Sequence, residues 1–392
     1  MPFKLSVKNF GPIKAANLEL TRVNVFVGPQ SSGKSTILKI ASFCNWLEKQ
    51  IQLSQNPLEW ATPQTVKDNL LTFHRLEGFA DVNSEILFKS ETMAINIRFK
   101  EKSQIGVDFE WSKSEHWNYT RTKNTYIPAE RNIVAANPNW MDINFDRFNN
   151  VRNYMAEWGI SRKLFDKKNK LDILDMGVSY FYDQSDETDK ISLNGKTLNF
   201  SNASSGLQSL IPQYALLSNL FDYSLTNAPA SLRKIQIDNA IKHFIESNPK
   251  LKEMGILDNY LKNCGVKVFL EEPEQNLFPE AQYRLVKWFA SKLNGNHHNN
   301  LFLSTHSPYI LASLNNLIQA HDSAKKGATE TKAVEKILKQ GDFINFDEVR
   351  VYGIDKGRAK NLLDKENRLI SQSFLDSVSM DISNEFGQLL SV

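Results

Sequence analysis

A short glycine-rich run contains the residues best suited to chemistry in this sequence. Gly28, Gly33, Lys34 and Ser35 follow the spacing Gly-x4-Gly-Lys-Ser. In such a run, backbone N–H groups face phosphates, the lysine reaches the β- and γ-phosphates, and the serine hydroxyl ligates Mg²⁺. The residues expected to contact ATP here are Gly28, Gln30, Ser31, Ser32, Gly33, Lys34, Ser35 and Thr36. The run predicts a phosphate loop for ATP with Mg²⁺, in which Lys34 assists catalysis and Ser35 holds the metal.

The neighbouring residues are those that such a loop needs. Residues 23–27 form an apolar run suited to the centre of a sheet. After the loop, apolar residues recur with the period of a helix that packs one face on a sheet. These residues are Ile37, Ile40, Ala41, Cys44 and Leu47. A glycine turn that only caps a helix is the alternative, and the strand before the loop and the helix after it argue against that alternative.

A second pair of candidate residues ends another apolar stretch. Val268, Phe269 and Leu270 predict a buried strand, and Glu271 and Glu272 follow directly. We expect Glu271 to hold the Mg²⁺ and Glu272 to position or deprotonate the attacking water. Two glutamates after a strand otherwise form a solvated strand end. The phosphate loop in the same chain favours the catalytic interpretation.

Two further motifs bear on the same chemistry. Ser204, Ser205 and Gly206 open an amphipathic helix whose N-terminus either binds an anion or is an ordinary helix cap. The next strand after Glu272 ends in His306. This histidine is either structural or close enough to a γ-phosphate to sense it, and we expect the second.

In this order the motifs resemble those of the ABC-type ATPases, and most closely the soluble ATP-binding proteins related to the OLD (overcoming lysogenization defect) ATPases. The segments that carry the resemblance are residues 28–36, 126–131, 203–208, 271–274 and 304–308. The resemblance implies a head-to-tail homodimer with two ATP molecules between its subunits. Ser205 and Gly206 of one subunit would then contact the γ-phosphate held by Lys34 of the other, and His306 would act as the switch histidine.

The resemblance also assigns the remaining motif positions. Residues 274–277 match the segment that crosses the dimer interface, and Glu130 and Arg131 are candidates for the region of the glutamine loop. Two residues depart from the common pattern. Gln30 replaces the asparagine usual after Gly-Pro, and Leu207 replaces the second glycine of the transporter signature.

The overall composition fits a folded ATPase of this kind. The chain has 392 residues and a formal net charge of +3, so it is neither a strongly basic binder nor an acidic tail protein. Only two cysteines, Cys44 and Cys264, are present, which predicts a reducing compartment. No stretch approaches the apolar run of about 20 residues that a membrane span needs. We therefore expect a cytoplasmic protein without membrane contact.

The patterning along the chain predicts the fold class. It is α/β: an ABC-type P-loop NTPase head with a mixed or parallel core sheet, an antiparallel β subdomain and an inserted helical lobe. Alternation over residues 85–111 predicts a second, antiparallel sheet, and Asn194-Gly195 between two apolar runs predicts a hairpin. The expected parts are residues 1–134 with the phosphate loop, 135–190 as the helical lobe, 191–320 with the later motifs, and 321–392 as a helical and strand extension.

Two kinds of function agree with these motifs. The first is a regulatory or sensor ATPase of a prokaryotic phage-defence or toxin-type system, which controls an effector protein encoded nearby. OLD nucleases carry a nuclease domain after the ATPase, and too few residues follow His306 for one here. A transporter subunit is the weakest interpretation, since the signature is unlike theirs.

The second function is a DNA-repair or DNA-clamping ATPase, so that nucleic acid is a possible partner. It rests on interleaved aromatic and basic residues and on a basic cluster in the lobe. These residues are Trp111, Lys113, His116, Trp117, Tyr119, Arg121 and Lys123, with Arg162, Lys163, Lys167, Lys168 and Lys170 in the lobe. A strand with one solvated face gives the same pattern.

Overall fold

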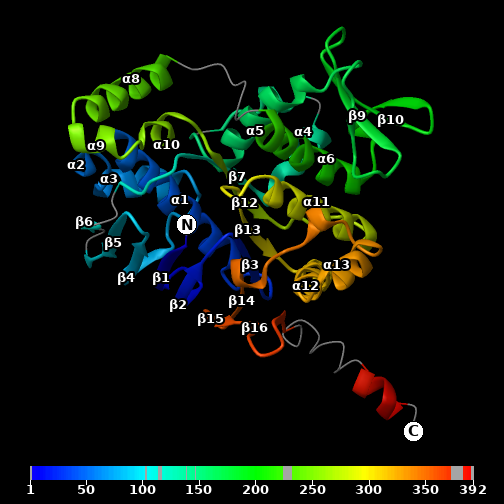
Figure 1. The fold of residues 1–392 in the computed structure, drawn as a ribbon. Coiled ribbons are helices and arrows are strands. Elements are labelled where there is room, and N and C mark those ends of the chain that lie inside the picture. The colour runs from blue at the N-terminus through cyan, green and yellow to red at the C-terminus, as the bar shows by residue number, and fades with distance from the viewer. Residues whose placement is uncertain are drawn as a thin grey trace.

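The computed structural model describes residues 2–101, 104–113, 117–137, 139–145, 147–223, 232–371 and 383–389. Its largest element is an 11-stranded mixed sheet with the order β6-β5-β4-β1-β2-β15-β14-β3-β13-β12-β7 (Figure 1). The strands are β1 (Phe3–Phe10), β2 (Ile13–Leu20), β3 (Val23–Val27), β4 (Ala80–Lys89), β5 (Met93–Phe99), β6 (Ile105–Trp111), β7 (Thr122–Ile127), β12 (Gly265–Glu271), β13 (Asn300–Thr305), β14 (Val349–Asp355) and β15 (Arg358–Asn361). The mixed α/β class predicted from the sequence is confirmed.

One half of this sheet is parallel and fully covered. β14, β3, β13, β12 and β7 run in the same direction. Every residue of β3 and of β13 is buried, as expected for parallel strands with helices on both faces. Because parallel strands end at the same edge of a sheet, the residues that follow β3, β12 and β13 meet there.

Alternate residues of the central strands face two different cores. Val25 and Val27 belong to the core formed with the helices of one face, whereas Phe26 belongs to the core formed with α1. Phe269 and Phe302 stack on the α1 face with their ring centroids 4.5 Å apart. The longer helices are α1 (Lys34–Ser54), α5 (Asn150–Ser161), α6 (Ser205–Ser218), α8 (Leu232–Glu246), α11 (Pro279–Gly295), α12 (Pro308–Ala324) and α13 (Ala328–Glu335). α5, α6, α11 and α12 cover the face opposite α1.

The antiparallel strands predicted over residues 85–111 are confirmed, but they do not make a second sheet. β4, β5 and β6 extend the main sheet through β1 and β2, and β15 joins β2 to the parallel half. The prediction of a separate sheet was therefore wrong here. Side-chain alternation indicates which residues share a face, but it does not reveal which strands are neighbours.

The lobe over residues 135–190, which was predicted to be helical, is only partly helical. After α4 (Ile133–Ala136) and α5, the chain forms a four-stranded antiparallel sheet in the order β11-β10-β9-β8, seen at the upper right of Figure 1. Its strands are β8 (Leu171–Asp172), β9 (Val178–Asp183), β10 (Thr188–Leu193) and β11 (Lys196–Asn199). Tyr180, Phe181 and Tyr182 of β9 are all buried, so this strand shows none of the polar alternation that identifies a half-exposed strand.

The hairpin predicted at Asn194-Gly195 is confirmed. It joins β10 to β11, and Leu193 pairs with Lys196 across the turn. Asn194 and Gly195 have φ values of 49° and 75°, and positive φ at both central residues is the geometry that two-residue hairpins prefer.

Three of the described residues that suggested a nucleic-acid surface are buried, whereas Lys163, Lys167, Lys168 and Lys170 of the lobe are exposed. Tyr119 is buried, and Arg121 is buried in an ion pair with Asp238. Trp117 contacts the ring of Tyr260, in a small core that α8 shares. In the lobe, the Arg162 guanidinium is buried against Trp140 and Tyr182 and pairs with Asp189. His116 lies outside the described residues. These arginines hold local structure and do not form an exposed basic stripe.

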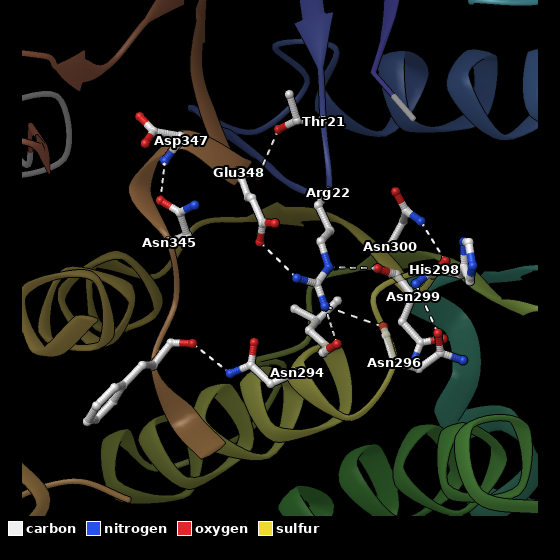
Figure 2. A network of polar contacts seen from close by, with 12 residues as sticks. Thr21, Arg22, Asn294, Asn296, His298, Asn299, Asn300, Asn345, Asp347 and Glu348 are labelled. Atoms are coloured by element: carbon white, nitrogen blue, oxygen red, sulfur yellow. Dashed lines mark hydrogen bonds and ion pairs between the residues drawn. The ribbon is translucent and has the colours of Figure 1, made fainter. Parts of the chain in front are cut away.

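A polar network joins the strand ends at the edge away from the phosphate loop (Figure 2). Arg22, directly before β3, donates to Glu348 at 2.8 Å and to the carbonyl oxygens of Asn296 and Asn299, both at 3.3 Å. A further bond reaches the carbonyl of Leu293 in the last turn of α11. A cation is favourable at a helix C-terminus, so Arg22 ties α11 to the starts of β3 and β14.

The C-terminal part of the chain is not an appendage to the fold. β14 lies between β3 and β15 near the centre of the sheet, within the part of the chain expected to form a helical and strand extension. The shorter elements are α2 (Pro57–Trp60), α3 (Pro63–Val66), η1 (Lys67–Thr72), η3 (Ala129–Asn132), η4 (Trp140–Asp142), η5 (Arg162–Leu164), η6 (Phe200–Asn202), η7 (Asn219–Tyr223), α9 (Pro249–Glu253), α10 (Leu257–Leu261), η8 (Gln340–Asp342), η9 (Phe346–Glu348), β16 (Leu363–Asp364) and β17 (Leu369–Ile370). In the part of the chain that the structure describes, no helix combines the length and apolar character needed to cross a membrane.

Candidate active site

The phosphate loop, residues 28–36, leads from β3 into α1 as the sequence predicted. Gly28 and Gly33 have φ values of 155° and 105°. A Cβ at Gly28 would lie 2.3 Å from the carbonyl oxygen of Ile354, and a Cβ at Gly33 would lie 2.3 Å from Ile13. Both positions therefore require glycine, because the loop is pressed against the hairpins on either side of it.

The Lys34 side chain lies over this loop. Its Nζ donates to the carbonyl oxygens of Gly28 at 2.8 Å and of Pro29 at 2.7 Å. Burial lowers the pKa of Lys34, while Glu272, Glu274 and, least, Glu271 oppose that shift. The ammonium group thus lies at the strand ends among three carboxylates, within the loop expected to hold phosphates.

The other loop residues are suited to a phosphate ligand. Gln30 and Ser31 are exposed, whereas Thr36 is buried. The Ser32 hydroxyl is buried and has no hydrogen-bond partner among the described residues. Since a buried hydroxyl without a partner is costly, this orphaned group fits a site that ATP completes.

Glu271, the last residue of β12, lies beside Ser35. Its carboxylate is buried and accepts hydrogen bonds from the hydroxyls of Tyr126 and Ser35. Burial raises the pKa of Glu271, and the Lys39 ammonium opposes this shift. A carboxylate next to a serine hydroxyl is an oxygen pair of the kind that Mg²⁺ prefers, so these two residues fit the metal.

Glu272 turns away from that pair and faces a histidine. Its backbone has a φ of 44°, a left-handed conformation that is unusual for a residue other than glycine, and its N–H donates to Ser304 at 2.8 Å. The Glu272 Oε1 atom lies 3.4 Å from His306 Nε2, and both side chains are partly exposed. Strained backbone of this kind concentrates at functional sites, which agrees with a catalytic role.

Glu274 and Arg131 hold the strand ends at this edge in place through hydrogen bonds. Glu274 accepts hydrogen bonds from the Thr305 hydroxyl at 2.8 Å and from the backbone N–H of His306 at 2.7 Å. The buried Arg131 donates to the carbonyl oxygens of Glu271 at 2.8 Å, Glu272 at 2.5 Å and Ser209 at 3.1 Å. Glu274 was expected only at a dimer interface, and Arg131 only near the glutamine loop. Their support of the two strand ends was not predicted.

Tyr126 and His74 form a buried pair of rings next to Glu271. Burial and the neighbouring Glu271 raise the pKa of Tyr126 well above its ordinary value. The ring of His74 contacts that of Tyr126, with centroids 5.0 Å apart. Burial, with a smaller contribution from Lys39, lowers the pKa of His74 to about 3. Neither Tyr126 by itself nor His74 was predicted as a site residue, because no local motif contains both with Glu271.

Ser205 and Gly206 lie at the start of α6, as predicted. Ser204 caps the helix by accepting from the Leu207 N–H at 3.5 Å. A Cβ at Gly206 would lie 2.9 Å from the carbonyl oxygen of Asn276, so the helix start is pressed against that turn. Ser205 is exposed, and among the described residues no hydrogen bond joins it or Gly206 to the phosphate loop. The structure gathers Lys34, Ser35, Glu271, Glu272 and His306 at one edge, and in the part of the chain that it describes no hydrogen bond or ion pair links them to Ser205 or Gly206.

Comparison with known proteins supports the interpretation of this chain as an ATPase. Residues 3–254 match the family described as the AAA ATPase domain. No curated protein matches the chain. The chain resembles a structure of the recombination mediator protein RecF-ATPrS in the RecFOR pathway, at 11% identity and a TM-score of 0.38, over 92% of this chain and 98% of that one.

Two ATP-binding cassettes of ABC transporters also resemble the chain. One matches at 10% identity and a TM-score of 0.31, over 97% of this chain and 96% of its own. The other, described as a dimeric bacterial cassette, matches at 9% identity and a TM-score of 0.29, over 91% and 96%. Structural similarities this weak do not support any conclusion about the function of this chain. The family match covers more than half of the residues, and the chain therefore belongs to the AAA ATPase domain family and is an ATP-hydrolysing enzyme.

Proposed function

We propose that this protein is a Mg²⁺-dependent ATPase of the ABC type that hydrolyses ATP at sites shared between two head-to-tail subunits. One observation supports this proposal best. Lys34, Glu272 and His306 follow three neighbouring parallel strands and meet at one sheet edge, while Ser205 is exposed at a helix start and has no hydrogen bond to that edge among the described residues.

Each residue at the edge has a chemical task in this proposal. Lys34 would bind the β- and γ-phosphates, together with the backbone N–H groups of the loop. Ser35 and Glu271 would hold Mg²⁺, which neutralises phosphate charge when bound. Glu272 would accept a proton from the attacking water, and His306, adjacent to Glu272, would contact the γ-phosphate.

The dimer is proposed because two of the residues expected to contact phosphate, Ser205 and Gly206, have no hydrogen bond to the phosphate loop of their own chain among the described residues. The start of α6 offers unpaired backbone N–H groups and the positive end of a helix dipole, which favour an anion. Ser205 and Gly206 would supply these groups to the γ-phosphate held by the partner subunit. ATP would then hold the two subunits together, and hydrolysis would release them.

Light scattering of Glu272→Gln with Mg²⁺ and ATP tests the shared site. The substitution keeps the shape of the site but removes the proton acceptor, so we expect a dimer that persists with ATP. The double variant Lys34→Ala, Glu272→Gln is the matched control and should stay monomeric. A Glu272→Gln protein that binds ATP tightly yet remains monomeric at every concentration would contradict the shared site.

We further propose that the ATPase is a cytoplasmic regulatory subunit of a prokaryotic phage-defence or toxin-type system. The motif resemblance to the OLD-related proteins supports this role. So does a set of exposed large apolar side chains between residues 141 and 164, which a partner effector would cover. They are Met141 at 62%, Phe148 at 55%, Ile160 at 70% and Leu164 at 39% exposure.

Affinity capture in the native host separates this role from the DNA-clamping alternative. We expect the product of a neighbouring gene to co-purify with the protein, and to be lost from Ile160→Glu. Glu330→Lys, an exposed change on α13, serves as the control. ATP hydrolysis that double-stranded DNA stimulates in a salt-sensitive manner, without any co-purifying protein, would instead support the alternative.

A further inference from the structure

Tyr126 lies next to Glu271 across two paired strands. β7 and β12 are parallel neighbours, and Tyr126 pairs with Phe269 in their register. Side chains alternate along a strand, so Glu271, two residues after Phe269, points to the same face of the sheet as Tyr126. The Tyr126 hydroxyl reaches along this face to Glu271 Oε1. The bond is buried, with exposed fractions of 3% for Tyr126 and 7% for Glu271.

The direction of this hydrogen bond is fixed by chemistry. An ionised carboxylate only accepts, so the phenol donates its O–H to Glu271. Ser35 is the other hydroxyl at this carboxylate, and it is itself an expected ligand of the cation. Tyr126 is not an expected ligand of the cation, so its hydroxyl can keep this bond when a cation binds.

The Tyr126 ring is itself held in place. It contacts the buried ring of His74 nearly edge to face, with centroids 5.0 Å apart and an interplanar angle of 70°. A tyrosine with a fixed ring presents its hydroxyl at one position only. The hydrogen bond can therefore set the direction of the Glu271 carboxylate.

A glutamate at this strand end needs such a partner. A glutamate side chain has one more methylene group and one more rotatable bond than an aspartate, so its carboxylate can take more directions. We propose that Tyr126 is a positioning residue, whose hydroxyl occupies Glu271 Oε1 and so directs the longer carboxylate toward Ser35. This inference rests on the proposed function, in which Ser35 and Glu271 hold Mg²⁺.

The test measures ATP binding against Mg²⁺ concentration in the Glu272→Gln background, so that ATP is not consumed. Tyr126→Phe should raise the Mg²⁺ concentration for half-maximal binding by about tenfold, a typical effect of removing a partner of a metal ligand. ATP affinity without divalent cation should stay unchanged. Tyr180→Phe is the matched control, because it removes a buried phenol that donates to Asp189 in the other sheet.

Two further variants separate the possible outcomes. Glu271→Ala should also shift the Mg²⁺ dependence. If it does and a folded Tyr126→Phe does not, Tyr126 has no positioning role. If neither variant shifts it, the metal site of the proposed function fails, and this inference fails with it.

Glu271→Asp keeps the assay decisive if Tyr126→Phe does not fold. The shorter aspartate places its carboxylate farther from the Tyr126 hydroxyl, so the Mg²⁺ concentration for half-maximal ATP binding should rise although a carboxylate remains. An aspartate that supports ATP binding at the same Mg²⁺ concentration as the native glutamate would overturn the proposal.

Discussion

Glu272 and His306 face each other across two strand ends, with Oε1 and Nε2 3.4 Å apart. β12 and β13 are parallel neighbours in which Glu271 pairs with Ser304, so the residues after each strand emerge side by side. Glu274 fixes this arrangement by accepting a hydrogen bond from the His306 backbone N–H at 2.7 Å. The proposed proton acceptor and the proposed phosphate sensor therefore share one rigid edge.

Lys34→Ala should weaken ATP binding roughly 10- to 100-fold, because it removes a charge-assisted contact to the phosphates. Titration with a fluorescent ATP analogue measures the change. Lys4→Ala, an exposed lysine on β1, is the control and should bind as the native protein does. Equal affinities in both variants would remove Lys34 from the site.

Glu272→Gln should lower the rate of ATP hydrolysis by about 10² to 10⁴, the usual contribution of a general base, and leave ATP binding intact. Phosphate release at saturating ATP measures the rate. Glu280→Gln, on the exposed side of α11, should hydrolyse ATP normally. If Glu272→Gln turns over normally while Glu271→Gln does not, the base is Glu271.

Mixing Lys34→Ala with Ser205→Arg chains should restore part of the ATPase activity that each lacks alone. In a mixed head-to-tail dimer both defects fall on one site and leave the other site intact. Phosphate release from the mixture measures the recovery, and light scattering verifies that mixed dimers form. A structure with ATP bound in which Ser205 contacts the nucleotide of its own subunit would argue against a shared site.

His74→Phe should make the protein less sensitive to acid. The pKa of His74 is about 3 in the folded chain, below its ordinary value of 6.5. Between these values only the unfolded chain takes up the proton, so stability is fully present above pH 6.5 and falls as the pH drops toward 3. This group alone should lower the free energy of unfolding by about 2 kcal/mol between pH 7 and pH 5.

Urea unfolding at pH 7 and pH 5 measures the His74 contribution. His243→Phe changes an exposed histidine on α8. Between pH 7 and pH 5 this variant should lose as much stability as the native protein does. His74→Phe should lose less. The same loss in all three proteins would mean that His74 does not contribute to acid sensitivity.

The local motifs were readable from the sequence because each depends on neighbouring residues. The spacing of Gly28, Gly33 and Lys34 specifies a loop whose conformation only glycines allow, and the strand before it and the helix after it follow from short-range periodicity. The hairpin at Asn194-Gly195 was predicted for the same reason, since its turn requires two positive φ values. These features depend on backbone conformation within a few residues.

Only the tertiary structure decided which distant residues became neighbours. It placed the Tyr126 hydroxyl on Glu271 through strand register, and it used Arg131 to join Ser209 to the end of β12. It also buried Arg121 and Arg162, whose charges had suggested a nucleic-acid surface. A sequence pattern specifies the face of a strand or helix on which a side chain lies. Burial and partners depend instead on which elements pack against that face, and this is set by contacts between residues far apart in the chain.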